Sequence, residues 1–135
     1  MVDSPLHISL AHSSDYALVA FSEQYPIGID IQWPCQKLLH VKRKFLNDNE
    51  SQQSGSDLEK LCIYWCAKEA LYKMQGGRGL SLKDDICIEE FVKKKRGTVR
   101  GTVRKQLFAV HYRFYSGYVL AWTEARGLCE EYSLL

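Results

Sequence analysis

Two short segments of the chain carry carboxylates among apolar residues. Residues 28–32 read GIDIQ, and the period of two places Asp30 and Gln32 on one face of a strand while the isoleucines take the core face. Further along, Glu69 and Lys73 fall one turn apart on a single helical stripe. Because Mg²⁺ binds one or two carboxylates together with phosphate oxygens and water, the two segments predict a magnesium and phosphate site.

The lysines beside Glu69 leave two interpretations open. The ammonium group of Lys73 would neutralise a bound phosphate, or it would form an exposed salt bridge with Glu69 worth about 0.3–0.5 kcal/mol. Lys68 is rotated by about 100° from Glu69 around the helix. We therefore expect Lys68 to pack or pair locally.

Strands and one long helix must position these groups. Alternating apolar, aromatic and β-branched residues predict strands at 7–11, 16–22, 27–32, 86–92, 98–104, 107–115 and 118–124. The last four follow one another closely, which indicates an antiparallel meander. We expect an α+β fold, with an antiparallel sheet packed against one long helix, in a single domain over residues 1–135.

Local signals set the expected helix boundaries. Ser56 and Glu59 form a capping-box pattern that predicts the start of the long helix, which then runs to Gln75. A shorter amphipathic helix is expected at 36–46. The polar composition of residues 47–55 predicts an irregular loop between the two helices.

Composition is that of an ordinary globular protein. The net charge is only +2, and 46% of the residues are hydrophobic. No apolar run reaches the roughly 18 residues of a membrane span, and no signal-peptide pattern opens the chain. The five cysteines are odd in number and lack paired CxxC spacing, which favours reduced thiols. We therefore expect a cytoplasmic protein with no membrane contact.

One basic stretch suggests a different class of function. Residues 93–96 read KKKR and precede a doubled GTVR segment at 97–104. Such a hairpin would suit nucleic-acid phosphates, which makes a nucleic-acid-binding module one alternative. The plainer interpretation, which we favour, is a solvated turn whose charged edge discourages edge-to-edge pairing of strands.

Four motifs in order resemble the 4′-phosphopantetheinyl transferases, and most closely the carboxyl-terminal half of the surfactin-synthetase-activating type. They are ISLAHS at 8–13, GIDIQ at 28–32, WCAKEALYK at 65–73 and GRGLSL at 77–82. The resemblance covers roughly residues 7–124. A lone GID motif is weak, but its order and spacing with the KEA motif are specific.

The resemblance implies a holo-carrier-protein synthase. Such enzymes move the phosphopantetheine arm of coenzyme A onto a serine of an acyl or peptidyl carrier protein, with magnesium at the pyrophosphate. It assigns the metal to Asp30 and Glu69, while the family's third acid is Gln32 here, a neutral oxygen ligand. Glu69 is the implied general base for the serine hydroxyl, and Lys73 the implied partner of the breaking pyrophosphate.

The same resemblance assigns the binding contacts. His12 and Ser13 match the family's Ser-His-Ser segment, which implies a contact to the 3′-phosphate of coenzyme A, although the first serine is Ala11 here. The implied contact to the acidic helix of a carrier protein is a group of cations that follows the GIDIQ strand: Lys37, Lys42, Arg43 and Lys44.

Relatives of this type resemble two similar halves in one chain, whereas this sequence holds one GID and one KEA motif. One expectation is that a second copy supplies the missing half, so that a homo-oligomer completes the site. The alternative is a truncated or degenerate relative that performs no chemistry.

Overall fold

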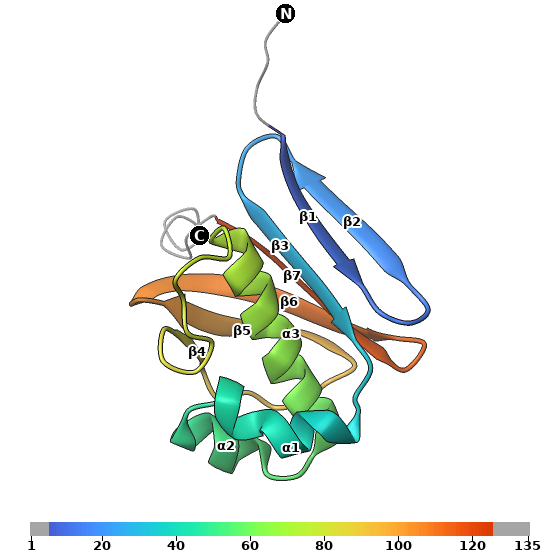
Figure 1. Ribbon diagram of the computed structural model, residues 1–135, viewed down its shortest axis with the longest axis vertical. Coiled ribbons are helices and arrows are strands. Elements are labelled where there is room, and N and C mark those ends of the chain that lie inside the picture. Colours follow the sequence, from blue (N-terminus) through green and yellow to red (C-terminus); the bar gives the residue numbers. More distant parts are fainter. Residues whose placement is uncertain (1–5, 126–135) are drawn as a thin grey trace, which may run out of the picture.

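The computed structural model describes residues 6–125. Seven strands form a two-stranded hairpin, β1-β2, and a five-stranded antiparallel sheet in the order β3-β7-β6-β5-β4 (Figure 1). Their bounds are β1 His7–His12, β2 Ala17–Ser22, β3 Ile27–Gln32, β4 Ile86–Ile88, β5 Arg96–Val103, β6 Gln106–Tyr115 and β7 Tyr118–Glu124. The expected α+β fold, an antiparallel sheet against one long helix, is confirmed; only the strand expected at 86–92 is much shorter than predicted.

The long helix is α3 (Leu58–Met74), which crosses one face of the sheet and forms the main core with it (Figure 1). Leu61, Ile63 and Leu71 are fully buried in this core. The predicted helix start is wrong by one residue, because Asp57 rather than Ser56 is the N-cap and accepts a hydrogen bond from the Lys60 amide. No helix in the described range 6–125 has the length and hydropathy of a membrane span.

Two shorter helices, α1 (Gln36–Phe45) and α2 (Asp48–Ser54), cover the amino-terminal end of α3 (Figure 1). The irregular loop expected at 47–55 is therefore wrong. Asn47 and Glu50 form a capping box, each side chain bonding the other's backbone amide at 2.9 Å. Because the capping box satisfies two amides that a short helix otherwise leaves unpaired, a polar sequence folds as a helix here.

The isoleucines of β3 do not face the main core. Ile29 and Ile31 form a second, smaller core with Ala11 and Tyr118, on the face of the sheet that the β1-β2 hairpin covers. The opposite face of β3, which carries Asp30, packs against α3. Both faces of β3 are therefore covered. The prediction that the isoleucines of this strand face the main core is wrong, because the face that carries Asp30 packs against α3 instead.

The outer face of the β1-β2 hairpin is apolar and exposed. Ile8 lies opposite Phe21 and Leu10 opposite Val19, and these four side chains are 56–67% exposed. The inner face of the same hairpin contributes Ala11, Leu18 and Ala20 to the smaller core. The hairpin is therefore apolar on both faces, and only its inner face is covered within residues 6–125.

Cys35, Cys62, Cys66 and Cys87 are free thiols, as expected, and Cys129 lies outside the described residues.

Candidate active site

The candidate site forms where β3 lies directly on α3. A Cβ at Gly28 would lie 1.8 Å from the Ala70 carbonyl oxygen, so only glycine permits this contact. Further along β3, the Gln32 carbonyl accepts a hydrogen bond from Cys62 Sγ at 3.4 Å. Four helix residues rise about 6 Å and two strand residues about 6.6 Å, so the two elements stay in register as they run antiparallel. Asp30, midway between these contacts, is thereby placed against the face of α3.

Lys73 connects three elements through its ammonium group. Its Nζ donates to the Leu10 carbonyl at 2.9 Å, the Ile29 carbonyl at 3.0 Å and Asp30 Oδ1 at 3.1 Å. A salt bridge between neighbours on the helix would have paired Lys73 with Glu69. In the structure Lys73 instead pairs with Asp30. β1 and β3 belong to different sheets and are not paired by backbone hydrogen bonds. Two side chains connect them: Lys73, and Ser9, whose hydroxyl accepts a hydrogen bond from the Ile29 amide at 3.0 Å.

Asp30 is a buried carboxylate with one free oxygen. Its side chain is only 13% exposed, and its Oδ2 is buried without a hydrogen-bond partner among the described residues. Burial raises the pKa of Asp30, and the neighbouring Lys73 ammonium opposes that rise. An unsatisfied buried carboxylate oxygen is costly unless a ligand binds it, so Oδ2 is the position at which a cation is expected.

Glu69 lies half-buried beside Asp30. Burial raises its pKa, the negative charge of Asp30 raises it further, and Lys73 lowers it. Two carboxylates that disfavour each other's ionisation are stabilised by a shared cation, which also removes the repulsion. A carboxylate with a raised pKa is also a better proton acceptor than an ordinary glutamate.

The donor set at this point fits a hard cation such as Mg²⁺. Asp30 and Glu69 supply carboxylate oxygens, and Gln32 lies two residues beyond Asp30 on the same face of β3. Within residues 6–125 no three Asp, Glu, His or Cys side chains gather into a metal site. A cation here would therefore depend on two carboxylates, with the remaining ligands from phosphate and water, which is the pattern Mg²⁺ prefers.

The other predicted ligands lie outside this cluster. Gln32 Nε2 points to Cys35 Sγ at 3.7 Å, and His12 is exposed at the end of β1. Ser13 Oγ is buried without a partner in the turn that follows. Tyr118 holds this turn by donating to Asp15 Oδ2. The structure therefore joins Asp30, Glu69 and Lys73 in one cluster and places His12 and Ser13 on a separate turn at the end of the hairpin.

The motif analysis missed Glu50, which supports the site through its ion pair with Lys68, the residue before Glu69. Lys68 is fully buried, as local pairing predicts, and its Nζ donates to Glu50 Oε1 at 2.6 Å and to the Leu82 carbonyl at 2.8 Å. Glu50 Oε2 accepts from the Ile88 amide at 2.7 Å. Since Lys68 precedes Glu69, this pair fixes the rotation of α3 that turns Glu69 toward Asp30. The N-x-x-E capping pattern from Asn47 was the available signal for Glu50.

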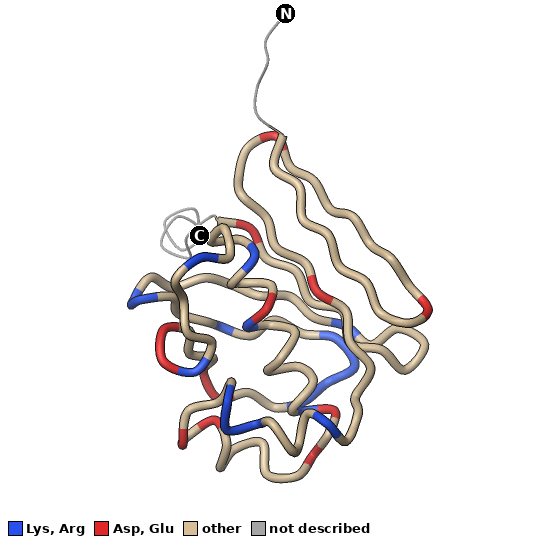
Figure 2. Tube along the Cα trace, viewed as in Figure 1, with Lys and Arg blue, Asp and Glu red and all other residues tan. Residues whose placement is uncertain are grey.

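The basic groups singled out by sequence divide into two kinds. Lys42 donates to the Ser51 and Gly55 carbonyls and so braces α2, while Lys37, Arg43 and Lys44 are exposed on α1. In the stretch proposed for nucleic acid, several charges are neutralised locally. The ion pairs are Lys93 with Asp57 and Glu59, Arg100 with Glu89, and Arg104 with Asp85. The charged groups of both signs are interspersed along the trace (Figure 2).

Comparisons with known proteins show which proteins this chain is similar to. The 4′-phosphopantetheinyl transferase gsp of Aneurinibacillus migulanus is 28% identical over 80 residues, which cover 56% of this chain and 33% of that protein. The chain thus spans about a third of the length of this curated relative. The fold is similar to that of the holo-[acyl-carrier-protein] synthase (AcpS) of Thermotoga maritima, with a TM-score of 0.58 and 17% identity over 75% of this chain and 63% of that one.

The sequence model of the 4′-phosphopantetheinyl transferase superfamily matches residues 26–126. This range contains β3, α3 and the clustered Asp30, Glu69 and Lys73. The match covers most of the chain, and it begins at the strand that carries the buried carboxylate. The chain therefore belongs to the 4′-phosphopantetheinyl transferase superfamily.

Proposed function

We propose that this chain carries the catalytic cluster of a holo-carrier-protein synthase. The reaction transfers the 4′-phosphopantetheine arm of coenzyme A to a serine of an acyl or peptidyl carrier protein in the cytoplasm. The observation that carries the proposal is the buried, unpartnered Oδ2 of Asp30 beside Glu69 and Lys73. Family membership supports it, and so do the printed names of the transferase and the synthase that the chain resembles.

Asp30 and Glu69 would hold a Mg²⁺ ion, with phosphate and water as the remaining ligands, and the ion would stabilise negative charge on the pyrophosphate. The carrier serine oxygen bonds to the β-phosphorus of coenzyme A, and the bond from that phosphorus to the bridging oxygen breaks. Adenosine 3′,5′-bisphosphate leaves with the bonding electrons. Glu69, whose pKa burial and Asp30 raise, accepts the serine proton directly or through a water molecule.

Lys73 has two roles in this proposal. Its ammonium group lies at Asp30, where it adds positive charge beside the site of the pyrophosphate. It also holds the carbonyls of Leu10 and Ile29, so it fixes the hairpin strand that leads to His12. Loss of Lys73 should therefore affect both chemistry and the placement of His12.

His12 and Ser13 are the proposed contacts to the 3′-phosphate of coenzyme A. Their turn exposes an imidazole, and it presents a serine oxygen that lacks a hydrogen-bond partner within residues 6–125. The exposed cations of α1, namely Lys37, Arg43 and Lys44, are the proposed contact to an acidic helix of the carrier protein.

We also propose that the apolar outer face of the β1-β2 hairpin binds a second transferase-like half, here another copy of the chain. Ile8, Leu10, Val19 and Phe21 form this face, and their exposure is unfavourable in an isolated protomer. An inactive relative of the family is the alternative. Light scattering separates the two when it is read together with activity, because the inactive relative stays monomeric and transfers nothing.

The decisive experiment incubates the chain with coenzyme A, Mg²⁺ and an apo carrier protein, and follows the carrier by mass spectrometry. The proposal expects the mass gain of one phosphopantetheine arm, and its loss in Asp30→Ala and Glu69→Gln. Glu59→Gln is the matched control, because Glu59 lies on the same helix but pairs with Lys93 at the surface. Transfer that survives both site substitutions would refute the assignment.

A further inference from the structure

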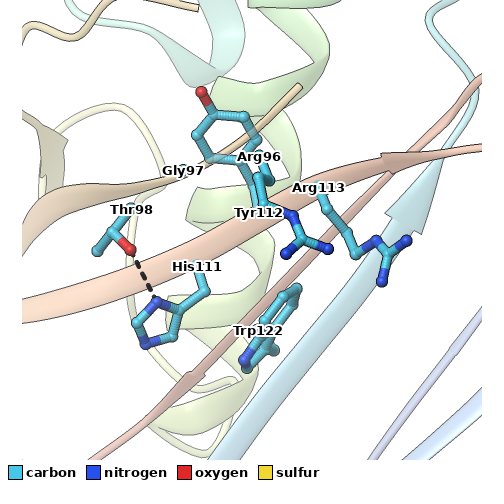
Figure 3. Close-up of a pocket in the computed structure, with 7 residues that line it drawn as sticks. All are labelled: Arg96, Gly97, Thr98, His111, Tyr112, Arg113 and Trp122. Carbon is cyan, nitrogen blue, oxygen red and sulfur yellow. Dashed lines mark hydrogen bonds between the residues drawn. The ribbon is translucent and has the colours of Figure 1, made fainter. Parts of the chain in front are cut away.

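A second group of cations lies on the opposite face of the sheet from Asp30. On β6, Phe108, Val110 and Tyr112 point into the main core, so His111 and Arg113 point outward. His111 lies in register with Thr98 of β5 and Trp122 of β7. Figure 3 shows the imidazole of His111 and the guanidinium groups of Arg96 and Arg113 gathered near the indole of Trp122. Since Asp30 faces α3, this cluster is separate from the catalytic one.

The charges in this cluster are unusually placed. Arg96 and Arg113 are direct cross-strand partners, a position where like charges destabilise a sheet. Among residues 6–125 neither forms an ion pair, and Arg113 Nε is buried without a hydrogen-bond partner. By contrast, Arg100 and Arg104 of the adjoining β5 segment pair with Glu89 and Asp85. Within the part of the chain that the structure describes, the Arg96–Arg113 pair therefore lacks a counter-charge, whereas other arginines of the same hairpin have one.

The surface between these groups is hollow. A cavity of about 460 Å³ is lined by Arg96, Arg113, His111 and Trp122, among others. A second cavity of about 190 Å³ shares His111 and Trp122 with the first. The first cavity falls in the range of small-molecule sites, roughly 300–1,000 Å³, and the second is smaller than that. The groove is therefore cationic beside the arginines and aromatic beside Trp122.

Hydrogen bonding and ring contacts fix the aromatic part of the groove. Thr98 Oγ1 and His111 Nδ1 are hydrogen-bonded at 2.9 Å, which orients the imidazole. The ring centroids of His111 and Trp122 lie 5.6 Å apart with an interplanar angle of 38°. Among the described residues no hydrogen bond is seen to the other imidazole nitrogen, and the indole of Trp122 is half-buried.

We propose that this groove binds a phosphate monoester group carried by an aromatic ligand such as a nucleoside monophosphate. Two guanidinium groups and an imidazole supply enough donors for the three terminal oxygens of a phosphate, whereas a carboxylate is satisfied by one arginine. A bound dianion places opposite charge between Arg96 and Arg113 and removes their repulsion. Trp122 then stacks on the attached ring.

Isothermal titration of the full chain, without coenzyme A or Mg²⁺, tests the proposal with AMP, inorganic phosphate and adenosine as probes. Arg96→Gln and Arg113→Gln should each weaken AMP binding about tenfold or more, since each removes charged hydrogen bonds. Arg113→Lys keeps the charge but loses the forked geometry, so an intermediate loss is expected. Arg104→Gln is the matched control and should leave the affinity unchanged.

The probes distinguish the source of the phosphate. AMP tighter than inorganic phosphate identifies an aromatic ester, and equal affinities identify phosphate itself with no contribution from Trp122; adenosine alone should bind in neither case. No millimolar binding of AMP or phosphate overturns the proposal, and so does equal weakening by Arg104→Gln. Asp30→Ala should not change AMP affinity here, so a failure of the transfer site leaves this test intact. Far-UV circular dichroism confirms that each variant is folded.

Discussion

The buried pair between Glu50 and Lys68 should be the most sensitive polar contact in the fold. Their side chains are 1% and 0% exposed, and Glu50 is the only carboxylate that reaches Lys68 within the described range. Glu50 Oε1 accepts from Lys68 Nζ and the Asn47 amide, while Oε2 accepts from the Ile88 amide. In Glu50→Gln, a single carbonyl oxygen replaces two acceptors, so its amide group must face one of these donors.

The expected cost follows from what remains buried. Lys68 keeps the Leu82 carbonyl and at most one neutral amide oxygen at position 50, and its charge has no counter-ion within the described range. Removing one member of a buried ion pair costs about 3–5 kcal/mol, a large part of the roughly 5–15 kcal/mol that stabilises a typical domain. For a chain of 135 residues this corresponds to a fall of about 10–20 °C in Tm.

Urea unfolding followed by circular dichroism measures this free energy, with Glu89→Gln as the surface control. Glu89 meets Arg100 at 3.6 Å with both side chains about half exposed, so its loss should cost about 0.2–1 kcal/mol. In a double-mutant cycle, adding Lys68→Met to Glu50→Gln removes the stranded charge and should recover part of the loss. A Glu50→Gln variant within about 1 kcal/mol of wild type would refute the claim that the pair is buried and essential.

Three further predictions concern the site itself. Gly28→Ala places a Cβ 1.8 Å from the Ala70 carbonyl oxygen, so it should lower unfolding free energy by at least about 1–3 kcal/mol and reduce transfer, as measured by urea unfolding and carrier mass. Because burial raises the pKa values of Asp30 and Glu69, the metal-free folded state binds protons more readily than the unfolded state, and the contribution of these groups to stability rises as pH falls. Mg²⁺ should therefore raise Tm most at alkaline pH and least in acid, with no rise in Asp30→Asn; a pH-independent shift would argue against binding at these carboxylates. Lys73→Met removes three hydrogen bonds at the junction of two strands and should speed amide exchange across the hairpin; unchanged exchange would show that Lys73 does not hold it.

Sequence periodicity predicted most elements because they are locally determined. The strand at 27–32 alternates strictly, the strand at 118–124 is rich in aromatic and aliphatic residues, and the helix near 58–74 begins at a capping residue and contains no Gly or Pro. Residues 47–55 were mistaken for a loop because the helix there has a buried glutamate in place of an apolar stripe. Periodicity assumes that buried positions are apolar, and Glu50 breaks that assumption by pairing with a lysine distant in sequence.

By itself the sequence determined the family and the helix and strands that carry the motifs. It also singled out Asp30, Glu69 and Lys73 as side chains that could take part in chemistry. Local spacing is enough for this, because alternation and helical period place side chains on faces. Only the tertiary structure decided that Lys73 pairs with Asp30 and that Asp30 faces α3. It also decided that Asp30 Oδ2 lacks a hydrogen-bond partner, and that Arg96 and Arg113 lie side by side without a counter-ion, among residues 6–125. These relations depend on register between distant segments, and register is set by packing such as the contact of Gly28 with Ala70, which no local pattern encodes.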